Sequence, residues 1–240
     1  MKHHIKSIYQ PMCLAFTLAL ALIINTSCDT HEDVDLDMHV GYVLCSDHSC
    51  LSFADYQATK SEDREAVAVV FAEKNSKHAT LAVSLSELSG AFCDSLGMEN
   101  GTSCELDTCD GYGNTVAMYS CYIQEKQKGC PIAMKCFDTH YFSQSQYIPS
   151  VEEMRLLSKA APAINPIIRS LGGKEIKTTG DCWYWTSTEV SGNKPNQAWL
   201  CSALQGAIME TPKTEEHKAR PIVQLNYPKD YPGNNSFTNK

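Results

Sequence analysis

The chain has 240 residues, of which 43% are hydrophobic and 20% are charged, as in an ordinary globular protein. Its formal net charge is −8, and every Asp and Glu follows Cys28. The acidic surface that results argues against nucleic acid as a partner and against electrostatic capture by anionic lipid. About 210 residues remain after an N-terminal export segment is removed, which suits one domain.

The N-terminus has the pattern of a signal peptide. Two lysines precede an apolar run over residues 12–24, which is too short for a membrane span of about 20 apolar residues. Thr26 and Ser27 stand directly before Cys28, as in a lipobox, where the cysteine receives diacylglycerol before cleavage. Asn25 replaces the aliphatic residue that is usual three positions before the cysteine, so conventional cleavage stays open as the alternative.

We predict that residues 1–27 form a lipoprotein signal peptide and that Cys28 is the lipid attachment site, which makes the membrane a partner through the anchor. Residues 28–39 are acidic and are typical of a solvated tether. The same segment resembles the acidic export signal that directs Bacteroidota lipoproteins to the outer face of the outer membrane. The expected location is therefore the outer membrane, at the cell surface.

Ten cysteines follow Cys28, and an even number in an exported chain predicts disulfides. Zinc is the alternative, because Cys104-x4-Cys109 and Cys130-x5-Cys136 have loose ligand spacing. No tight Cys-x2-Cys pair is present, so disulfides are preferred and no metal site is predicted. Connectivity does not follow from sequence, but local partners are favoured for Cys45 with Cys50 and for Cys104 with Cys109, and Cys182 is a plausible partner for Cys201 across adjacent strands.

The first half of the domain is predicted to contain a β-hairpin and long loops. Ala66–Ala72 is a short apolar run with a β-branched middle, which indicates a buried strand. A polar turn follows, and Ala79–Leu85 returns as the second arm. The other expectations are a strand over 40–45, a loop over 51–65, either helix or loop over 86–96, a Gly- and Asn-rich loop over 97–115 and a short helix over 115–124.

The clearest helix signal is Ser150 followed three residues later by Glu153, which is a capping box before an apolar face. This helix is expected to stop before Pro162, and a second helix over 165–171 to end at Gly172. Further on, 183–188 and 197–203 are predicted to pair as strands, and 218–225 to be the last strand. Residues 40–228 are taken as one domain, and residues 229–240 as a flexible tail.

Seven motifs in order along residues 40–226 resemble one bacterial family. They are Val83-Ser84-Leu85, Asp110-Gly111-Tyr112-Gly113-Asn114-Thr115, Ala133-Met134-Lys135-Cys136, Tyr147-Ile148-Pro149-Ser150-Val151-Glu152-Glu153, Tyr184-Trp185-Thr186-Ser187-Thr188-Glu189, Ala198-Trp199 and Arg220-Pro221-Ile222. The family is the lipoprotein domain family grouped with the C-terminal domain of the Legionella collagen-like adhesin and with the Fibrobacter succinogenes major paralogous domain.

The resemblance implies an α+β, C-type-lectin-like fold in which the first and last strands pair. Combined with the cysteines, it predicts short antiparallel strands, two helices and long disulfide-stapled loops. The cysteine content departs from the family, for which it is unusually high.

The three tryptophans all fall in the predicted 183–199 hairpin, with carboxylate and amide side chains between them. In sugar-binding proteins, aromatic faces stack on pyranose rings while such polar groups bond the hydroxyls. The alternative is that Trp185 and Trp199 are core residues, which their family positions favour. The predicted ligand-binding set is Trp183, Glu189, Asn193, Asn196 and Gln197.

Two segments invite comparison with calcium sites. Asp107–Thr115 alternates carboxylates and amides with Gly, but it offers too few oxygen ligands. A turn is preferred, in which Asp110 and Asn114 cap backbone groups and the glycines permit positive φ. In Lys194-Pro195-Asn196 a lysine stands where a calcium lectin needs a carboxylate, which argues against that type of site.

No catalytic motif or phosphate loop is present, so no catalytic residue, cofactor or enzymatic activity is predicted. The preferred hypothesis is a surface lipoprotein whose lectin-like domain binds a glycan or a host or matrix protein. The alternative is a structural or fimbria-associated envelope subunit without a small ligand. A binder should show a partly exposed aromatic cluster around Trp183 and Glu189, whereas a structural subunit should show an apolar patch or an unpaired strand edge.

Overall fold

The computed structural model describes residues 38–225, apart from 95–98, 122, 124–127, 139, 142–143 and 193–194. The predicted signal peptide, the lipid site at Cys28, most of the tether and the predicted tail lie outside the described residues. Within the described part, no helix combines the length and the apolar character that a membrane span requires.

One sheet, here called sheet A, has the strand order β12-β4-β3-β1-β2. Its strands are β1 (Val43–Cys45), β2 (Cys50–Leu51), β3 (Ala66–Ala72), β4 (Thr80–Ser84) and β12 (Ile222–Leu225). The predicted hairpin is confirmed, since β3 pairs antiparallel with β4 and Val69 lies opposite Val83. Part of the predicted 51–65 loop is the short helix α2 (Phe53–Ala58), which begins after the N-cap Ser52.

The second sheet, sheet B, has the order β10-β9-β8-β11-β5. Its strands are β5 (Leu88–Ala91), β8 (Trp183–Glu189), β9 (Gln197–Ser202), β10 (Ile208–Pro212) and β11 (Glu216–Ala219). The predicted pairing of 183–188 with 197–203 is confirmed as the β8–β9 hairpin. A separate two-stranded ribbon joins β6 (His140–Tyr141) to β7 (Gln144–Ser145).

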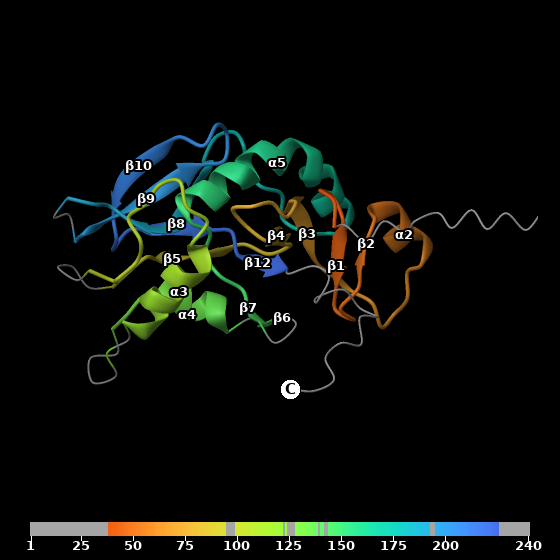
Figure 1. Cartoon of the computed structure of the whole chain (residues 1–240), viewed down its shortest axis with the longest axis horizontal. Helices are drawn as coiled ribbons and strands as arrows, with labels where there is room; N and C mark the ends of the chain where they lie inside the picture. Colours follow the sequence, from red (N-terminus) through yellow and green to blue (C-terminus); the bar gives the residue numbers. More distant parts are fainter. Residues whose placement is uncertain are drawn as a thin grey trace, which may run out of the picture. The chain divides into compact units, whose positions relative to one another are not determined.

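Three helices cover these sheets: α3 (Gly111–Ser120), α4 (Pro131–Phe137) and α5 (Val151–Ser170). Figure 1 shows α5 lying across elements of both sheets, with α3 and α4 on the other side of sheet B. The main core therefore joins Leu157 of α5 to Val69 of sheet A and Tyr184 of sheet B. A second core packs Ile132 of α4 against Trp185 of β8.

The two sheets, with helices packed on them, confirm the α+β class. The first and last described strands, however, do not pair with each other. They lie in the same sheet but are separated by β3 and β4. The predicted pairing of the terminal strands is therefore wrong for the described part of the chain.

The expected break before Pro162 is absent, because α5 continues through Pro162 and Pro166 as one helix. Each proline removes one backbone donor, but the apolar face is continuous across them. Ala161, Ile164 and Ile168 are fully buried in the main core, so tertiary burial outweighs the local penalty. The predicted stop at Gly172 is confirmed, with φ of +75° just past the C-cap Leu171.

The predicted last strand over 218–225 is divided between the two sheets. Ala219 ends β11 in sheet B, and Ile222 begins β12 in sheet A. Arg220 and Pro221 carry the chain across, with the Arg220 side chain fully buried at the crossing. Since proline has no N–H for a ladder bond, Pro221 is a natural point for the strand to change sheets.

The ten described cysteines contain no two sulfurs at bonding distance, so the predicted disulfide staples are not confirmed. In the β8–β9 hairpin, Cys201 lies opposite Tyr184, while the carbonyl of Cys182 accepts the N–H of Ala203 at 2.9 Å. Cys182 and Cys201 are therefore not directly opposed.

The predicted capping box is confirmed and does more than cap one helix. The Ser150 N–H donates to Glu153 Oε2 at 2.7 Å, and the Glu153 N–H donates to Ser150 Oγ at 3.3 Å. The buried Glu153 carboxyl also accepts the N–H of Gly111 at 3.1 Å and the hydroxyl of Tyr147 at 3.1 Å. One carboxyl thus joins the starts of α5 and α3 to Tyr147, in the segment that precedes α5.

Glu153 makes a pH-dependent contribution to stability. Its burial, opposed by the bonds from Ser150 and Tyr147, raises its pKa from 4.5 to about 7. Between these values the folded state keeps the proton that the unfolded chain releases, so the contribution is complete below pH 4.5. It falls by about 1.4 kcal/mol per pH unit as the pH rises to 7. Urea unfolding at several pH values should therefore show Glu153→Gln becoming more stable relative to wild type across this range. Parallel pH profiles would contradict the assignment.

Candidate functional site

A pocket of about 320 Å³ lies beside the turn that joins β8 to β9. Its wall on one side is Val190, Ser191 and Gly192 of the turn, and on the other side Gly101 and Thr102. This volume is at the lower end of those that hold small ligands. The pocket adjoins the predicted ligand-binding hairpin, and Glu189 forms part of its lining.

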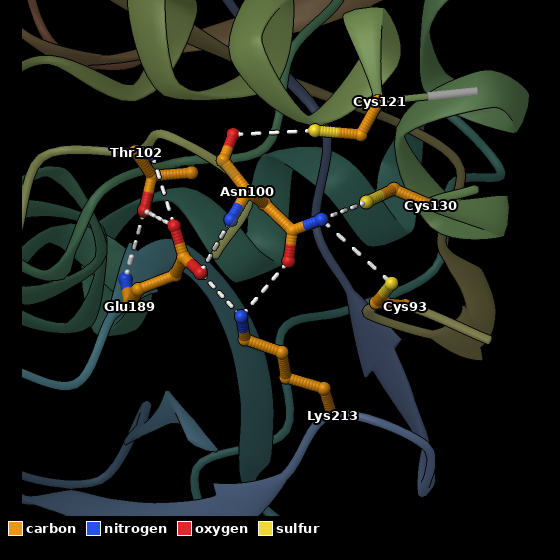
Figure 2. A network of polar contacts seen from close by, with 7 residues as sticks. All are labelled: Cys93, Asn100, Thr102, Cys121, Cys130, Glu189 and Lys213. Atoms are coloured by element: carbon orange, nitrogen blue, oxygen red, sulfur yellow. Dashed lines mark hydrogen bonds and ion pairs between the residues drawn. The ribbon is translucent and has the colours of Figure 1, made fainter. Parts of the chain in front are cut away.

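Glu189 and Thr102 of the pocket lining belong to a polar network (Figure 2). Glu189 Oε1 accepts the N–H of Asn100 at 2.8 Å and forms an ion pair with Lys213 Nζ. Its Oε2 accepts the N–H and the hydroxyl of Thr102, at 3.0 and 2.9 Å. Lys213 Nζ also donates to Asn100 Oδ1 at 2.9 Å. Every atom of the Glu189 carboxylate is therefore engaged inside the protein.

Both charges of the ion pair are removed from water. The Lys213 side chain is 0% exposed and that of Glu189 is 7% exposed. Burial alone would raise the pKa of Glu189, but Lys213 and the N–H groups of Asn100 and Thr102 outweigh it, so the pKa lies below the usual value. The carboxylate stays ionised and holds the loop that contains Asn100 and Thr102 against sheet B.

The backbone fixes Lys213 in this position from two sides. Its N–H donates to the carbonyl of Asn196 at 2.9 Å, and its carbonyl accepts the N–H of Cys93 at 3.0 Å. Lys213 follows β10 in a polar turn, where a lysine normally faces solvent. Sequence reasoning missed it because its partner Glu189 lies 24 residues away, and no local pattern links the two.

Trp183 and Glu189 do not belong to one site. They stand at opposite ends of β8, where Trp183 pairs with Ser202 and Glu189 with Ala198. The six residue steps from Trp183 to Glu189 span about 20 Å along a strand. Trp183 is half-buried against the second core. The expected aromatic and carboxylate cluster is therefore absent, because the length of the strand separates its two members.

Two further members of the predicted set lie near the turn. Asn196 and Gln197 are half-buried, and Gln197 begins β9 opposite Pro212. Asn193 lies outside the described residues. Trp185 is a core residue, as the alternative held, and its indole N–H donates to the Gly90 carbonyl at 3.0 Å. Trp199 is half-buried and lies opposite Glu210.

The Asp107–Thr115 segment is not a turn throughout, since α3 begins at Gly111. Asn114 does satisfy a backbone group, accepting the Ser103 N–H at 2.7 Å. Gly111 does not have a positive φ. Its position requires glycine because of close packing, since a Cβ there would lie 2.2 Å from Glu153 Oε2. Across the described residues, no group of three or more His, Cys, Asp or Glu side chains is placed to hold a metal ion.

The edges of the two sheets differ in how they are covered. At the β12 edge, Tyr147 and Ile222 exchange two backbone hydrogen bonds of 2.9 Å. At the β5 edge, Lys135 Nζ donates to the Ser89 carbonyl at 2.8 Å. The edge strand β2 has two residues. The outer side of the five-residue strand β10 has no neighbouring strand among the described residues, so it is the longest open edge in this part of the chain.

No family model matches this sequence, and neither does any curated protein. The structure is similar to the crystal structure of a fimbrial protein from Bacteroides ovatus, with a TM-score of 0.59 and 14% sequence identity. The similarity covers 78% of this chain and 49% of that protein. The chain thus spans about half the length of this neighbour, and the likeness concerns the fold.

The Lys213–Glu189 pair gives a direct test of the network. Lys213→Met should lower the free energy of unfolding by about 3–5 kcal/mol, because it leaves a buried carboxylate without its cation. Adding Glu189→Gln should recover part of this loss, since the amide is neutral and its oxygen still accepts N–H bonds. Denaturant titrations would measure both effects, with Lys77→Met, at an exposed lysine, as the control. A double variant as unstable as Lys213→Met alone would contradict the buried-charge explanation.

Proposed function

We propose that this protein is a structural, fimbria-associated subunit of the bacterial cell envelope, which assembles through the open edge of sheet B. The observation that carries the proposal is β10, a five-residue edge strand with no strand on its outer side among the described residues. Such an edge is a template for a strand from another chain. The fold likeness to a fimbrial protein supports the same interpretation.

The direction of the backbone groups on β10 follows from its register. Ser202 donates its N–H to the carbonyl of Ala207 at 2.7 Å, and bonded pairs then alternate along an antiparallel ladder. Met209 and Thr211 therefore bond towards β9, whereas the N–H and C=O of Ile208 and Glu210 point to the outer side. The outward N–H and C=O of Ile208 are groups that an added strand would use.

The surroundings of β10 are suited to a protein partner. Leu204, in the turn between β9 and β10, is 53% exposed, and Met209 on β10 is 42% exposed. Glu210 and Pro212 on the same strand limit unspecific pairing, as charges and prolines do on natural edges. The edge thus combines apolar contact area with features that select the partner.

The proposal includes the export features predicted from the sequence. A signal peptide over 1–27 and a lipid on Cys28 would place the domain at the outer membrane, at the cell surface. We also propose that the domain is non-catalytic. The lectin-like family resemblance stays a prediction beside these.

The β10 edge can be tested by removing one outward N–H. Ile208→Pro deletes the N–H that points away from β9 and leaves the β9–β10 ladder intact, and proline is tolerated as the first residue of an edge strand, so the fold should persist. We expect this variant to be lost from surface filaments sheared from the producing bacterium, whereas Ile208→Ala, which keeps the N–H and loses the same apolar contacts, should remain. Immunoblotting of the filament fraction measures this, and circular dichroism and thermal melting establish that both variants fold.

Two outcomes would overturn the assembly proposal. One is a wild-type protein that is absent from the filament fraction. The other is a folded Ile208→Pro variant that is incorporated as well as Ile208→Ala.

The pocket beside the β8–β9 turn favours a second function, the binding of a glycan. The hydroxyl of Ser191 in its wall could bond a sugar hydroxyl, although the pocket contains no aromatic residue among its described lining. A glycan array on the wild-type protein and on Ser191→Trp, which would fill the pocket, tests this. Binding that only the wild type shows would support the glycan function, and a flat array from folded protein would remove it.

A further inference from the structure

Three cysteine sulfurs gather around Asn100 (Figure 2). Asn100 Nδ2 lies 3.7 Å from Cys93 Sγ and 3.3 Å from Cys130 Sγ. Cys121 Sγ lies 3.5 Å from the main-chain carbonyl oxygen of Asn100. Cys93 and Cys130 thus share a single amide nitrogen as neighbour, while Cys121 contacts a different atom.

The backbone holds Cys93 and Cys130 side by side. The N–H of Asp94 donates to the Gly129 carbonyl at 3.0 Å, and the N–H of Gly129 donates to Asp94 Oδ1 at 2.9 Å. These bonds hold the residue that follows Cys93 against the residue that precedes Cys130. They therefore bring the two cysteines close together, as a disulfide with its Cα separation of about 4.4–6.8 Å requires.

The two thiols are enclosed by the protein and already contact each other. Both residues are 0% exposed. A side-chain hydrogen bond joins Cys130 to Cys93, and this bond, together with burial, raises the pKa of Cys130. A protonated, enclosed thiol reacts slowly. A disulfide between the two cysteines would therefore have to form before the loop around Asn100 closes.

We propose that Cys93 and Cys130 form a disulfide when the chain folds in an oxidising compartment. Each thiol loses its hydrogen, and one S–S bond forms between the two sulfurs. The oxidant is a second disulfide, protein-bound or glutathione, which accepts two electrons and two protons and leaves as two thiols. The new bond ties the exit of β5 to the start of α4 and closes the loop that contains Asn100, Thr102 and α3.

This crosslink would brace the buried ion pair. Cys93 donates its N–H to the carbonyl of Lys213, and Asn100 bonds both Lys213 and Glu189. Fixing Cys93 to Cys130 therefore restricts the unfolded states of the segment that covers the charges. The proposal is independent of assembly through β10, so each can fail without the other.

The direct experiment is a disulfide map of the wild-type protein. The full chain is produced in a bacterial host that exports it, denatured in N-ethylmaleimide and digested without reduction. Mass spectrometry should find a linked peptide pair containing Cys93 and Cys130, lighter than the two thiol peptides by two hydrogen atoms. Recovery of both cysteines as maleimide adducts, or a link from either to Cys121, would overturn the proposal.

Thermal melting gives a second readout. Dithiothreitol should lower the melting temperature of the exported wild type by about 5–15 °C. The Cys93→Ser/Cys130→Ser double variant should already melt lower and should not respond further. Cys136→Ser is the matched control: it is equally buried on α4, burial alone raises its pKa, and its variant should keep the full response. A double variant that still responds as wild type does would assign the effect to other cysteines.

Discussion

The ion pair between Lys213 and Glu189 is the interaction on which this end of the molecule depends. Two unit charges that have left water must be paired and bonded, or the fold is strongly destabilised. The pair satisfies this condition only because the loop with Asn100 and Thr102 folds over it and supplies N–H donors. Glu189 and Thr102 also line the pocket beside the turn after β8, and Asn100 links the ion pair to the cysteine cluster (Figure 2).

This arrangement bears directly on function. A carboxylate that already accepts four internal bonds has little capacity left for a ligand, so Glu189, one of the predicted ligand-binding residues, is a structural anchor. The open side of β10, in contrast, consists of backbone groups directed away from the fold. Backbone groups on an open edge favour association with another chain more than recognition of a small molecule.

The cysteines fit the same structural interpretation. The sequence predicted disulfides by number and by local spacing, yet Cys93 and Cys130, whose sulfurs both contact the Asn100 amide, are neither local nor in a tight motif. A bond between them would hold the loop that supplies Asn100 to the ion pair. In an envelope protein such a brace would act where folding is completed outside the reducing cytoplasm.

The sequence by itself determined the features that arise from neighbouring residues: the β3–β4 and β8–β9 hairpins, the Ser150–Glu153 capping box and the helix end at Gly172. These depend on local periodicity and local hydrogen bonds, which are visible in a short window. Only the tertiary structure decided that α5 continues through Pro162, that the chain changes sheets at Arg220, and that Lys213 meets Glu189. Each of these depends on which distant segment buries the residue, since burial can outweigh a local penalty and can require a partner that no local pattern reveals.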